Sequence, residues 1–277
     1  MLPNFLIIGA AKAGTTSLYH YIGAHPQAFM TAKKELSFFC EEFKWGLGLE
    51  WYESQFEGAG DAAAVGEASP RYSVYPLYKR VPERIASVLP GVRLIYLVRE
   101  PIDRMLSAYL DNMIHGLDDR PVEEALTSDP FYLSSSSYGL QLEQYLAHCR
   151  REQILVVRSD DLRRDRQAAL GRVFHFLGID PGWRGEVTDM EFLTTSQRRA
   201  PLPRFRRIWF SPLSARVARV LPRSLKDGFR TATSRQVEIQ RAEISPTFRR
   251  HLEGLLREDQ QRFRAIVGES FDGWGLG

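Results

Sequence analysis

The chain has 277 residues, 44% of them hydrophobic, and its 37 Lys and Arg against 34 Asp and Glu give a formal net charge of +3. This size and apolar content suffice for one large α/β domain, so a single domain over residues 1–277 is expected. The longest apolar stretches fall far short of the ~18 residues of a membrane span, and no basic segment precedes an apolar signal core. The expected location is therefore the cytoplasm.

The sequence has no pattern of metal ligands. Its two cysteines, Cys40 and Cys149, lie far apart and outside any C-x-x-C spacing, and its six histidines show no paired spacing of the H-E-x-x-H type. Neither a disulfide framework nor a zinc site nor a catalytic metal is expected.

The N-terminal segment has the pattern of a phosphate-binding loop. An apolar strand from Phe5 leads into a glycine-punctuated loop, and a helix is expected over 15–23. Backbone N–H groups of such a loop converge on an anion, and the positive end of the following helix adds to the attraction. The residues expected to bind the anion are Lys12, Ala13, Gly14, Thr15, Thr16 and Ser17.

The spacing of this loop differs from that of common nucleoside triphosphate-binding loops, which read G-x-x-x-x-G-K-[ST]. Gly9 and Gly14 keep the glycine interval, but Thr15 stands where the lysine is usual, and the lysine lies inside the loop as Lys12. A lysine there lies along a 5′-phosphate and its next group, which favours an anion that needs no metal. The alternative is a tight strand-to-helix turn with a solvated lysine.

Strand and helix patterns alternate along the rest of the chain. The expected strands cover 64–67, 92–98 and 153–158, and the expected helices cover 75–89, 102–115, 138–148 and 167–177. Pro82 implies a break or a second start within the first of these helices. The alternation predicts an α/β fold with a central, mainly parallel sheet and helices on both faces.

The residue that ends the strongest strand separates two enzyme classes. Phosphate-loop hydrolases and kinases commonly carry an acidic residue there to organise Mg²⁺, whereas this chain carries Arg99. An arginine at the carboxyl end of a parallel strand points into the crevice where open α/β sheets bind ligands, and its planar fork suits a second phosphate. Ser107 is expected to donate its hydroxyl to the same group. The alternative for Arg99 is a surface ion pair with Glu100 or Asp103.

Positive charge is concentrated in one segment. Residues 198–235 contain eleven Lys and Arg and one acidic residue, so the segment carries about +10 and the rest of the chain about −7. Such a segment can hold a multiply charged ligand, nucleic acid or an anionic membrane. No nucleic-acid motif is present, so the expectation is a cap over substrate or nucleotide at 198–240 and peripheral membrane contact through 204–235.

Four motifs, in order along the chain, resemble those of sulfotransferases that use 3′-phosphoadenosine 5′-phosphosulfate (PAPS). They are Lys12–Leu18, Lys34–Phe39, Gly66–Tyr72 and the stretch from Leu97–Pro101 through Ser107–Tyr109. The resemblance is to the heparan-sulfate-type sulfotransferase domains and their bacterial relatives, and it covers residues 4 to about 177. It implies that PAPS is the co-substrate, with no metal.

The resemblance assigns the two anion sites to the two ends of the donor. Lys12 and the 14–17 loop would hold the 5′-phosphosulfate, and Arg99 and Ser107 would hold the 3′-phosphate. Tyr138 resembles a position near the nucleotide, with aromatic core packing as its alternative.

The resemblance also implies the catalytic residues. Glu67 matches the acidic residue that takes the proton from the acceptor, and Lys12 would stabilise the departing phosphate. The alternative for Glu67 is that it caps a turn or pairs with Arg71. Lys34 is a further catalytic candidate near the sulfuryl group or the acceptor, unless it forms only a solvated basic pair with Lys33.

Three positions depart from the family pattern. Ser37 replaces a histidine that is frequent in the family, and Ala68 replaces a lysine of some relatives, which leaves the acceptor chemistry open. A loop at 194–199 occupies the place of the family's C-terminal nucleotide loop but lacks its lysine-glycine-arginine pattern. Only Arg198 and Arg199 carry over from it as candidate donor-binding residues.

The expected function is transfer of a sulfuryl group from PAPS to a hydroxyl, or less favourably an amine, of a carbohydrate, lipid or secondary metabolite. The alternative enzyme is an ATP-dependent small-molecule kinase, against which Arg99 and Thr15 argue. The alternative from another class is a noncatalytic protein that binds an anionic or membrane surface. The presence of both Lys12 and Glu67 weighs against it.

Overall fold

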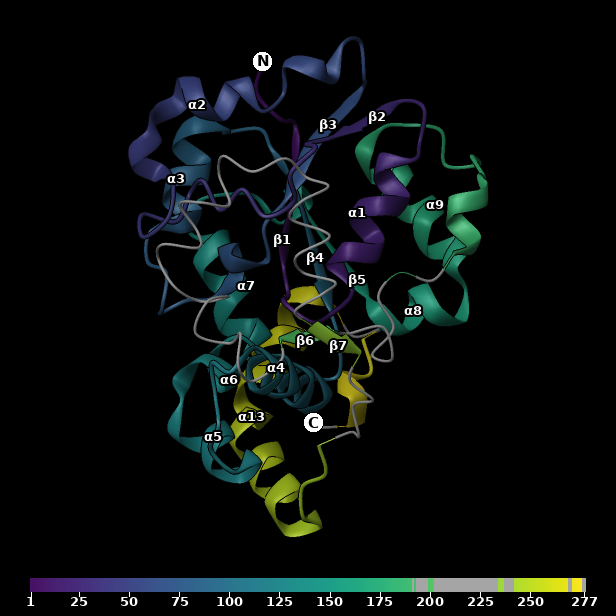
Figure 1. Cartoon of the computed structure of the whole chain (residues 1–277). Coiled ribbons are helices and arrows are strands. Elements are labelled where there is room, and N and C mark those ends of the chain that lie inside the picture. Colours follow the sequence, from purple (N-terminus) through teal and green to yellow (C-terminus); the bar gives the residue numbers. More distant parts are fainter. Residues whose placement is uncertain (191, 193–198, 202–233, 237–241, 269–270, 276–277) are drawn as a thin grey trace.

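Five parallel strands form the centre of the computed structural model, which describes residues 1–190, 192, 199–201, 234–236, 242–268 and 271–275. The strand order is β2-β3-β1-β4-β5, and every pair of neighbours is parallel. The strands are β1 (Phe5–Gly9), β2 (Ala28–Met30), β3 (Ala64–Ala68), β4 (Arg93–Val98) and β5 (Ile154–Arg158). Figure 1 shows them running side by side, with their carboxyl ends toward the lower half of the view.

The central strands are apolar because both of their faces are covered. All five residues of β1 and of β3 are buried, as expected for parallel strands between two layers of helices. Gly66 lies opposite Phe5 in the register, and a Cβ there would come within 2.4 Å of the Phe5 ring. The glycine therefore makes room for an aromatic ring inside the sheet layer.

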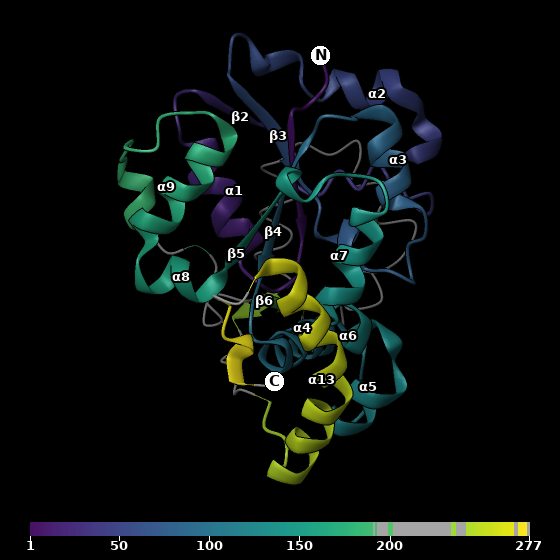
Figure 2. The same cartoon turned by 180° about the vertical axis from the view of Figure 1, so that it is seen from behind.

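Helices cover both faces of the sheet, which confirms the predicted architecture. On one side lie α1 (Thr15–Gly23), α8 (Ser159–Arg164) and α9 (Arg166–Leu177). On the other lie α2 (Gly48–Ser54), α3 (Val81–Val88) and α7 (Tyr138–Leu146), as the two opposite views in Figures 1 and 2 show.

A further group of helices lies at the carboxyl ends of the strands (Figure 2). It comprises α4 (Pro101–His115), α5 (Val122–Ser128), α6 (Pro130–Ser134) and α13 (Pro246–Val267). These helices share a second apolar core, in which Ile102 and Met105 of α4 pack in one cluster with Leu252 and Leu256 of α13. α4 is thereby anchored next to the end of β4.

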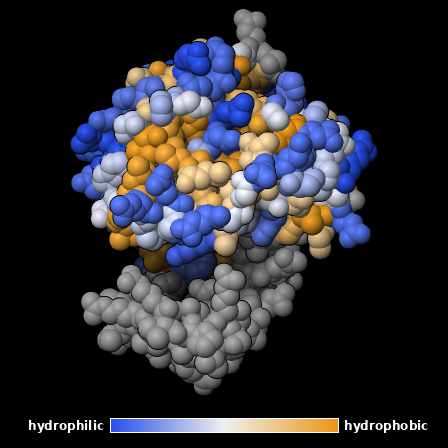
Figure 3. Space-filling model, turned by 90° about the horizontal axis from the view of Figure 1, so that it is seen from above, coloured by the Kyte–Doolittle hydropathy of each residue, from blue (hydrophilic) through white to orange (hydrophobic). Residues whose placement is uncertain are grey.

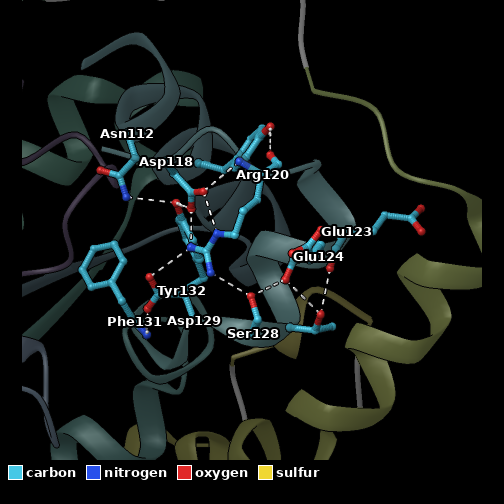
Figure 4. Close-up of polar contacts among 11 residues, drawn as sticks. Asn112, Asp118, Arg120, Glu123, Glu124, Ser128, Asp129, Phe131 and Tyr132 are labelled. Carbon is cyan, nitrogen blue, oxygen red and sulfur yellow. Dashed lines mark hydrogen bonds and ion pairs between the residues drawn. The ribbon is translucent and has the colours of Figure 1, made fainter. Parts of the chain in front are cut away.

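A polar network fastens the far end of α4 to the helices that follow it (Figure 4). Arg120 donates two hydrogen bonds of 2.8 and 2.7 Å to the buried Asp118 carboxylate, which also accepts one of 2.8 Å from the Tyr132 hydroxyl. Asn112 of α4 donates to the same Tyr132 hydroxyl at 3.0 Å. Because the Arg120 guanidinium hydrogen-bonds Asp118, the pKa of that carboxyl falls to about 2.

The remaining described elements are short. The 3₁₀ turns are η1 (Trp45–Leu47), η2 (Glu57–Ala59), η3 (Pro70–Ser73), η4 (Arg151–Gln153), η5 (Glu186–Asp189) and η8 (Gly273–Gly275). An antiparallel pair, β6 (Arg199–Pro201) and β7 (Ser234–Gln236), lies against α4. None of the helices in the described part of the chain is both long and apolar enough to cross a membrane.

Most of the predicted elements are present, with several differences. The helix expected over 75–89 begins only at Val81: residues 75–77 form a turn, Arg80 has a φ of 61°, and Pro82 occupies the first turn of the helix. The region expected as loop after the first helix contains β2 and α2, and the helices α5, α6, α8 and α13 were not predicted. Most of the predicted cap at 198–240 lies outside the described residues.

The opposite end of the sheet carries none of those predicted site residues that the structure describes. Figure 3 shows this end from above, with apolar and hydrophilic residues intermixed over the surface. A pocket beside the starts of β2 and β3 is lined by residues such as Pro26, Phe29 and Asp61. We therefore place the candidate site at the carboxyl ends, where the polar groups converge.

Candidate active site

Two predicted anion sites meet because β1 and β4 are neighbouring parallel strands. Their register pairs Gly9 with Tyr96, and the Ala10 N–H donates to the Leu97 carbonyl at 2.5 Å. The loop after β1 and the residue after β4 therefore lie at the same edge of the sheet. Open α/β sheets bind their ligands at such an edge.

The loop after β1 ends in an uncapped helix N-terminus. Gly14 occupies the N-cap of α1 with φ 103°, a left-handed conformation that favours glycine. No side chain caps this helix, so its first N–H groups remain available to an anion. Ala13 and Thr15 are buried beneath the loop, and Thr16 and Ser17 are partly buried at the start of the helix. This geometry is compatible with the predicted phosphate cradle, which stays a prediction.

Lys12 belongs to this loop and already has an anionic neighbour. Its backbone adopts φ 70°, and its Nζ lies 2.9 Å from Oδ1 of Asp111, on α4. The ammonium group is thus held between the loop after β1 and the helix after β4. A sequence reading of the loop alone did not predict Asp111.

Arg99 follows β4 and carries an unused donor. Its Nε is buried without a hydrogen-bond partner, while Nη2 lies 3.4 Å from Oδ2 of Asp103. The ion pair with Asp103 that the sequence allowed is therefore present, and donor capacity is left over for a ligand. Ser107 is partly buried one turn beyond Asp103 on α4 and makes no hydrogen bond to any described residue.

Tyr138 supports the backbone of this corner. The ring is fully buried, and its hydroxyl donates to the Arg99 carbonyl at 2.8 Å. The core packing that the sequence offered as an alternative is therefore present, and the contact with the nucleotide stays a prediction. Of the two arginines expected from the C-terminal loop, Arg198 lies outside the described residues, and Arg199 begins β6 beside α4.

Glu67 lies at the centre of a closed hydrogen-bond network. The side chain has no exposed surface, and its two oxygens accept from Ser69 Oγ at 2.6 Å and from the Tyr72 hydroxyl at 2.5 Å. Burial and the nearby Glu67 carboxyl raise the pKa of the Tyr52 hydroxyl, which makes no hydrogen bond in the described part of the chain. Burial raises the pKa of Glu67 to about 7, and the hydroxyl donors only partly offset this effect.

The same two hydroxyls accept hydrogen bonds from a neighbouring loop. The Ser37 N–H donates to Ser69 Oγ at 2.8 Å, and the Phe38 N–H donates to the Tyr72 hydroxyl at 3.0 Å. Glu67 thus fixes the loop that follows β2 through two hydroxyl relays. Its raised pKa suits a general base, while the side chain has no exposed surface in this structure. The role of Glu67 as the acceptor's base stays a prediction, and its contacts also give it a positioning role.

Glu35 is the accessible carboxylate of this region. It is 42% exposed, and its oxygens lie 3.0 Å from Lys34 Nζ and 3.1 Å from Arg71 Nη1. Its N–H donates to the carbonyl of Ala68, which ends β3, so Glu35 sits at the same sheet edge as the loop after β1. Arg71 therefore pairs with Glu35 and not with Glu67. Lys34 pairs with Glu35 too, which excludes a purely solvated basic pair with Lys33.

Sequence reasoning missed the roles of two site residues, Glu35 and Asp111, and named Asp103 only as an alternative partner of Arg99. Glu35 stood inside a quoted motif but received no role, and neither its exposure nor its backbone φ of 61° is visible in a sequence pattern. Asp103 and Asp111 flank Ser107 at four-residue spacings on α4, and this spacing was visible in the sequence. It identifies side chains that share a helix face, but not the partners that they meet.

The chain resembles known sulfotransferases in sequence and fold. A family model described as sulfotransferase domain matches residues 2–198. Human heparan sulfate glucosamine 3-O-sulfotransferase 5 is 31% identical over 193 residues, which are 65% of this chain and 54% of that protein. Membrane-associated sulfotransferase kil1 of Dictyostelium discoideum is 38% identical over 111 residues, which are 39% of this chain and 22% of that protein.

A solved structure has a similar fold. The crystal structure of a sulfotransferase from Alicyclobacillus acidocaldarius superposes with a TM-score of 0.73 at 23% identity, and 99% of each chain is covered. The chain spans about half or less of the length of the two curated relatives described above. On the match over residues 2–198, the chain belongs to the sulfotransferase domain family.

Proposed function

We propose that this chain transfers the sulfuryl group of PAPS to a hydroxyl group of a small-molecule, lipid or glycan acceptor. The observation that carries the proposal is the placement of two anion-receptive corners at one sheet edge, the uncapped start of α1 with Lys12 and the end of β4 with Arg99. A nucleotide with phosphates on both its 5′ and 3′ sides presents two anionic groups to these two corners. ATP has no counterpart for the second corner.

The residues present fit such a donor. The buried, unpartnered Nε of Arg99 is costly to leave unsatisfied and calls for an acceptor oxygen. Ser107 supplies a hydroxyl beside it, and the N–H groups at the start of α1 supply the other cradle. We assign the 3′-phosphate to Arg99 and Ser107 and the 5′-phosphosulfate to Lys12 and residues 13–17, with Arg199 as a candidate at the rim.

The reaction requires an in-line attack by the acceptor oxygen on the sulfur of PAPS. The new O–S bond forms while the bond from sulfur to the 5′-phosphate oxygen breaks, and the acceptor loses its proton. Lys12 is placed to stabilise the negative charge that develops on the departing phosphate. Lys34, partly buried beside Glu35, is placed to neutralise charge on the transferred group.

We propose Glu35 as the group that receives the acceptor's proton. It is the carboxylate at this edge that combines exposure with attachment to the end of β3. Glu67 has the opposite properties, since it is sealed and holds Ser37 and Phe38 in place through Ser69 and Tyr72. The assignment makes Glu35 the catalytic base and Glu67 the residue that sets its loop.

Two relatives bear on the class of acceptor. The human relative acts on heparan sulfate glucosamine by its name, and kil1 is named as membrane-associated. Both fit a hydroxyl acceptor that is a glycan or lies at a membrane, and the basic segment 198–235 would suit either one. The cytoplasmic location and the membrane contact through 204–235 stay predictions, and cell fractionation with vesicle sedimentation tests both.

A donor assay with isotopically labelled PAPS tests the function. We expect label to pass to at least one member of a panel of hydroxyl and amine acceptors, read as a product mass increased by one sulfuryl group, without added Mg²⁺. Calorimetry should show binding of 3′,5′-adenosine bisphosphate (PAP) in preference to ATP with Mg²⁺. Preference for ATP with strict dependence on Mg²⁺ would replace the proposal by a kinase.

A further inference from the structure

Two cations of the proposed donor site each face a carboxylate, and both carboxylates come from one helix. Lys12 Nζ lies 2.9 Å from Asp111, and Arg99 Nη2 lies 3.4 Å from Asp103. Asp103 and Asp111 both belong to α4, whereas their partners follow two different strands. An anionic group that binds to either cation must compete with the carboxylate that is already there.

The two carboxylates form a stripe along α4 with the serine assigned to the 3′-phosphate. Asp103, Ser107 and Asp111 follow one another at four-residue spacings, which place their side chains on neighbouring turns of one face. At 1.5 Å per residue, the two aspartates are about 12 Å apart along the axis. The helix therefore presents one negative group to each of the two corners of the site, with a neutral hydroxyl between them.

Both ion pairs are open enough to be exchanged. Lys12 and Asp111 are 24% and 31% exposed, and Arg99 and Asp103 are 19% and 46% exposed. Ion pairs at such positions are weak because water screens them, and breaking them costs little. A ligand that reaches the cations can therefore take the place of the carboxylates.

We propose that Asp103 and Asp111 are internal counter-ions that neutralise the two corners of the site until the donor's two anionic groups replace them. The inference rests on the proposed function. A carboxylate at each corner opposes every anion that binds there, so a ligand with one phosphate gains little binding free energy. A nucleotide with two anionic groups gains binding free energy at both corners, because binding at one corner holds its second group close to the other. The stripe thus weakens binding at the Lys12 corner for both kinds of nucleotide, and at the Arg99 corner only for a nucleotide that carries a 3′-phosphate.

The test uses two nucleotides that differ only in the 3′-phosphate, PAP and 5′-AMP, titrated calorimetrically into the full chain. Asp111→Asn removes the charge beside Lys12 and keeps the shape, so it should tighten binding of both ligands about three- to tenfold. Asp103→Asn should tighten PAP by a similar factor and leave 5′-AMP within about twofold, because 5′-AMP lacks the group that meets Arg99.

Two controls separate this effect from a general change of charge or structure. Glu83→Gln removes one negative charge from the exposed pair with Arg80 on α3 and should leave both dissociation constants within about twofold. In a Lys12→Met background, Asp111→Asn should lose most of its effect, since the carboxylate acts through competition for that lysine. Thermal unfolding of each variant verifies that the fold is kept.

The outcomes distinguish the inference from the proposed function. Tighter PAP binding in both asparagine variants, with 5′-AMP responding only to Asp111→Asn, supports the counter-ion stripe. If the wild-type chain binds PAP but both variants bind it equally well or more weakly, the inference is wrong and the proposed function stands. If the wild-type chain binds no PAP at all, the proposed function fails, and the inference fails with it.

Discussion

The end of β3 and the loop after β2 place two carboxylates in opposite environments. Glu67 has no exposed surface and is bound by two hydroxyls, whereas Glu35 is 42% exposed and is bound by two cations. Both belong to motifs that resemble those of sulfotransferases, so the motifs alone do not rank them. Our proposal ranks them by exposure: it assigns the positioning of a loop to the buried carboxylate and the exchange of a proton to the exposed one.

Replacing the two carboxylates one at a time gives the largest expected effect. Glu35→Gln should lower kcat by about 10²–10⁴-fold, the usual contribution of a general base, while PAP binding stays within a fewfold. Glu67→Gln should lower kcat by less than about tenfold, because it keeps a polar group within the network. Steady-state kinetics with PAPS and the acceptor from the panel decide, and the reverse ranking would restore Glu67 as the base.

The buried carboxyl should also make stability depend on pH. Burial raises the pKa of Glu67 from its ordinary 4.5 to about 7, so the folded chain binds this proton more tightly than the unfolded chain. The resulting stability is fully present below pH 4.5 and is lost as pH rises to about 7.

Relative to Glu67→Gln, the free energy of unfolding of the wild type should fall by up to about 3 kcal/mol across that window. Urea unfolding of both proteins at several pH values measures the difference. A difference that stays constant with pH would show that Glu67 does not titrate in this range.

Removing one relay hydroxyl should produce a smaller, structural effect. Tyr72→Phe leaves Glu67 Oε1 without its hydroxyl donor and the Phe38 N–H without its acceptor, so the free energy of unfolding should drop by about 1–3 kcal/mol. Displacement of the Glu35 loop should lower kcat in parallel. The matched control is Tyr109→Phe, whose hydroxyl donates to the Arg120 carbonyl outside this relay. Equal effects of the two variants on kcat would argue against the relay.

Breaking the exposed ion pair between Arg71 and Glu35 should have the smallest effect on stability and activity. Arg71→Ala removes one partner of Glu35 and the cation that lies 4.9 Å from the Phe43 ring centre, both at the surface. Pairs of this kind contribute at most about 1 kcal/mol, so unfolding should change little. The effect should appear in KM for the acceptor and not in the dissociation constant of PAP. A change confined to PAP binding would place Arg71 on the donor side.

The sequence predicted the donor side of the site better than the acceptor side. Strand, loop and helix around Lys12 follow from local apolar pattern and glycine spacing, and the structure has the helix at Thr15–Gly23 as expected. Arg99 was identified as a candidate because open α/β sheets bind their ligands at the carboxyl ends of the strands. These features depend on neighbours in the chain, which a sequence displays.

The acceptor side depends on contacts between residues far apart in sequence. Whether Glu67 or Glu35 is accessible is decided by hydroxyls and cations from other segments, such as Tyr72 and Arg71. The link between Lys12 and Asp111 likewise joins two segments that only the fold brings together. Burial, positive φ angles and ion pairs of this kind leave no periodic signal, so the roles of these residues required the structure.

A crystal structure of the chain with PAP tests the central claim most directly. The account predicts the 5′-phosphate at the start of α1 beside Lys12, the 3′-phosphate on Arg99 and Ser107, and Glu35 facing the space next to the 5′-phosphate. PAP bound away from the carboxyl ends of β1 and β4, or with both phosphates distant from Lys12 and Arg99, would contradict it.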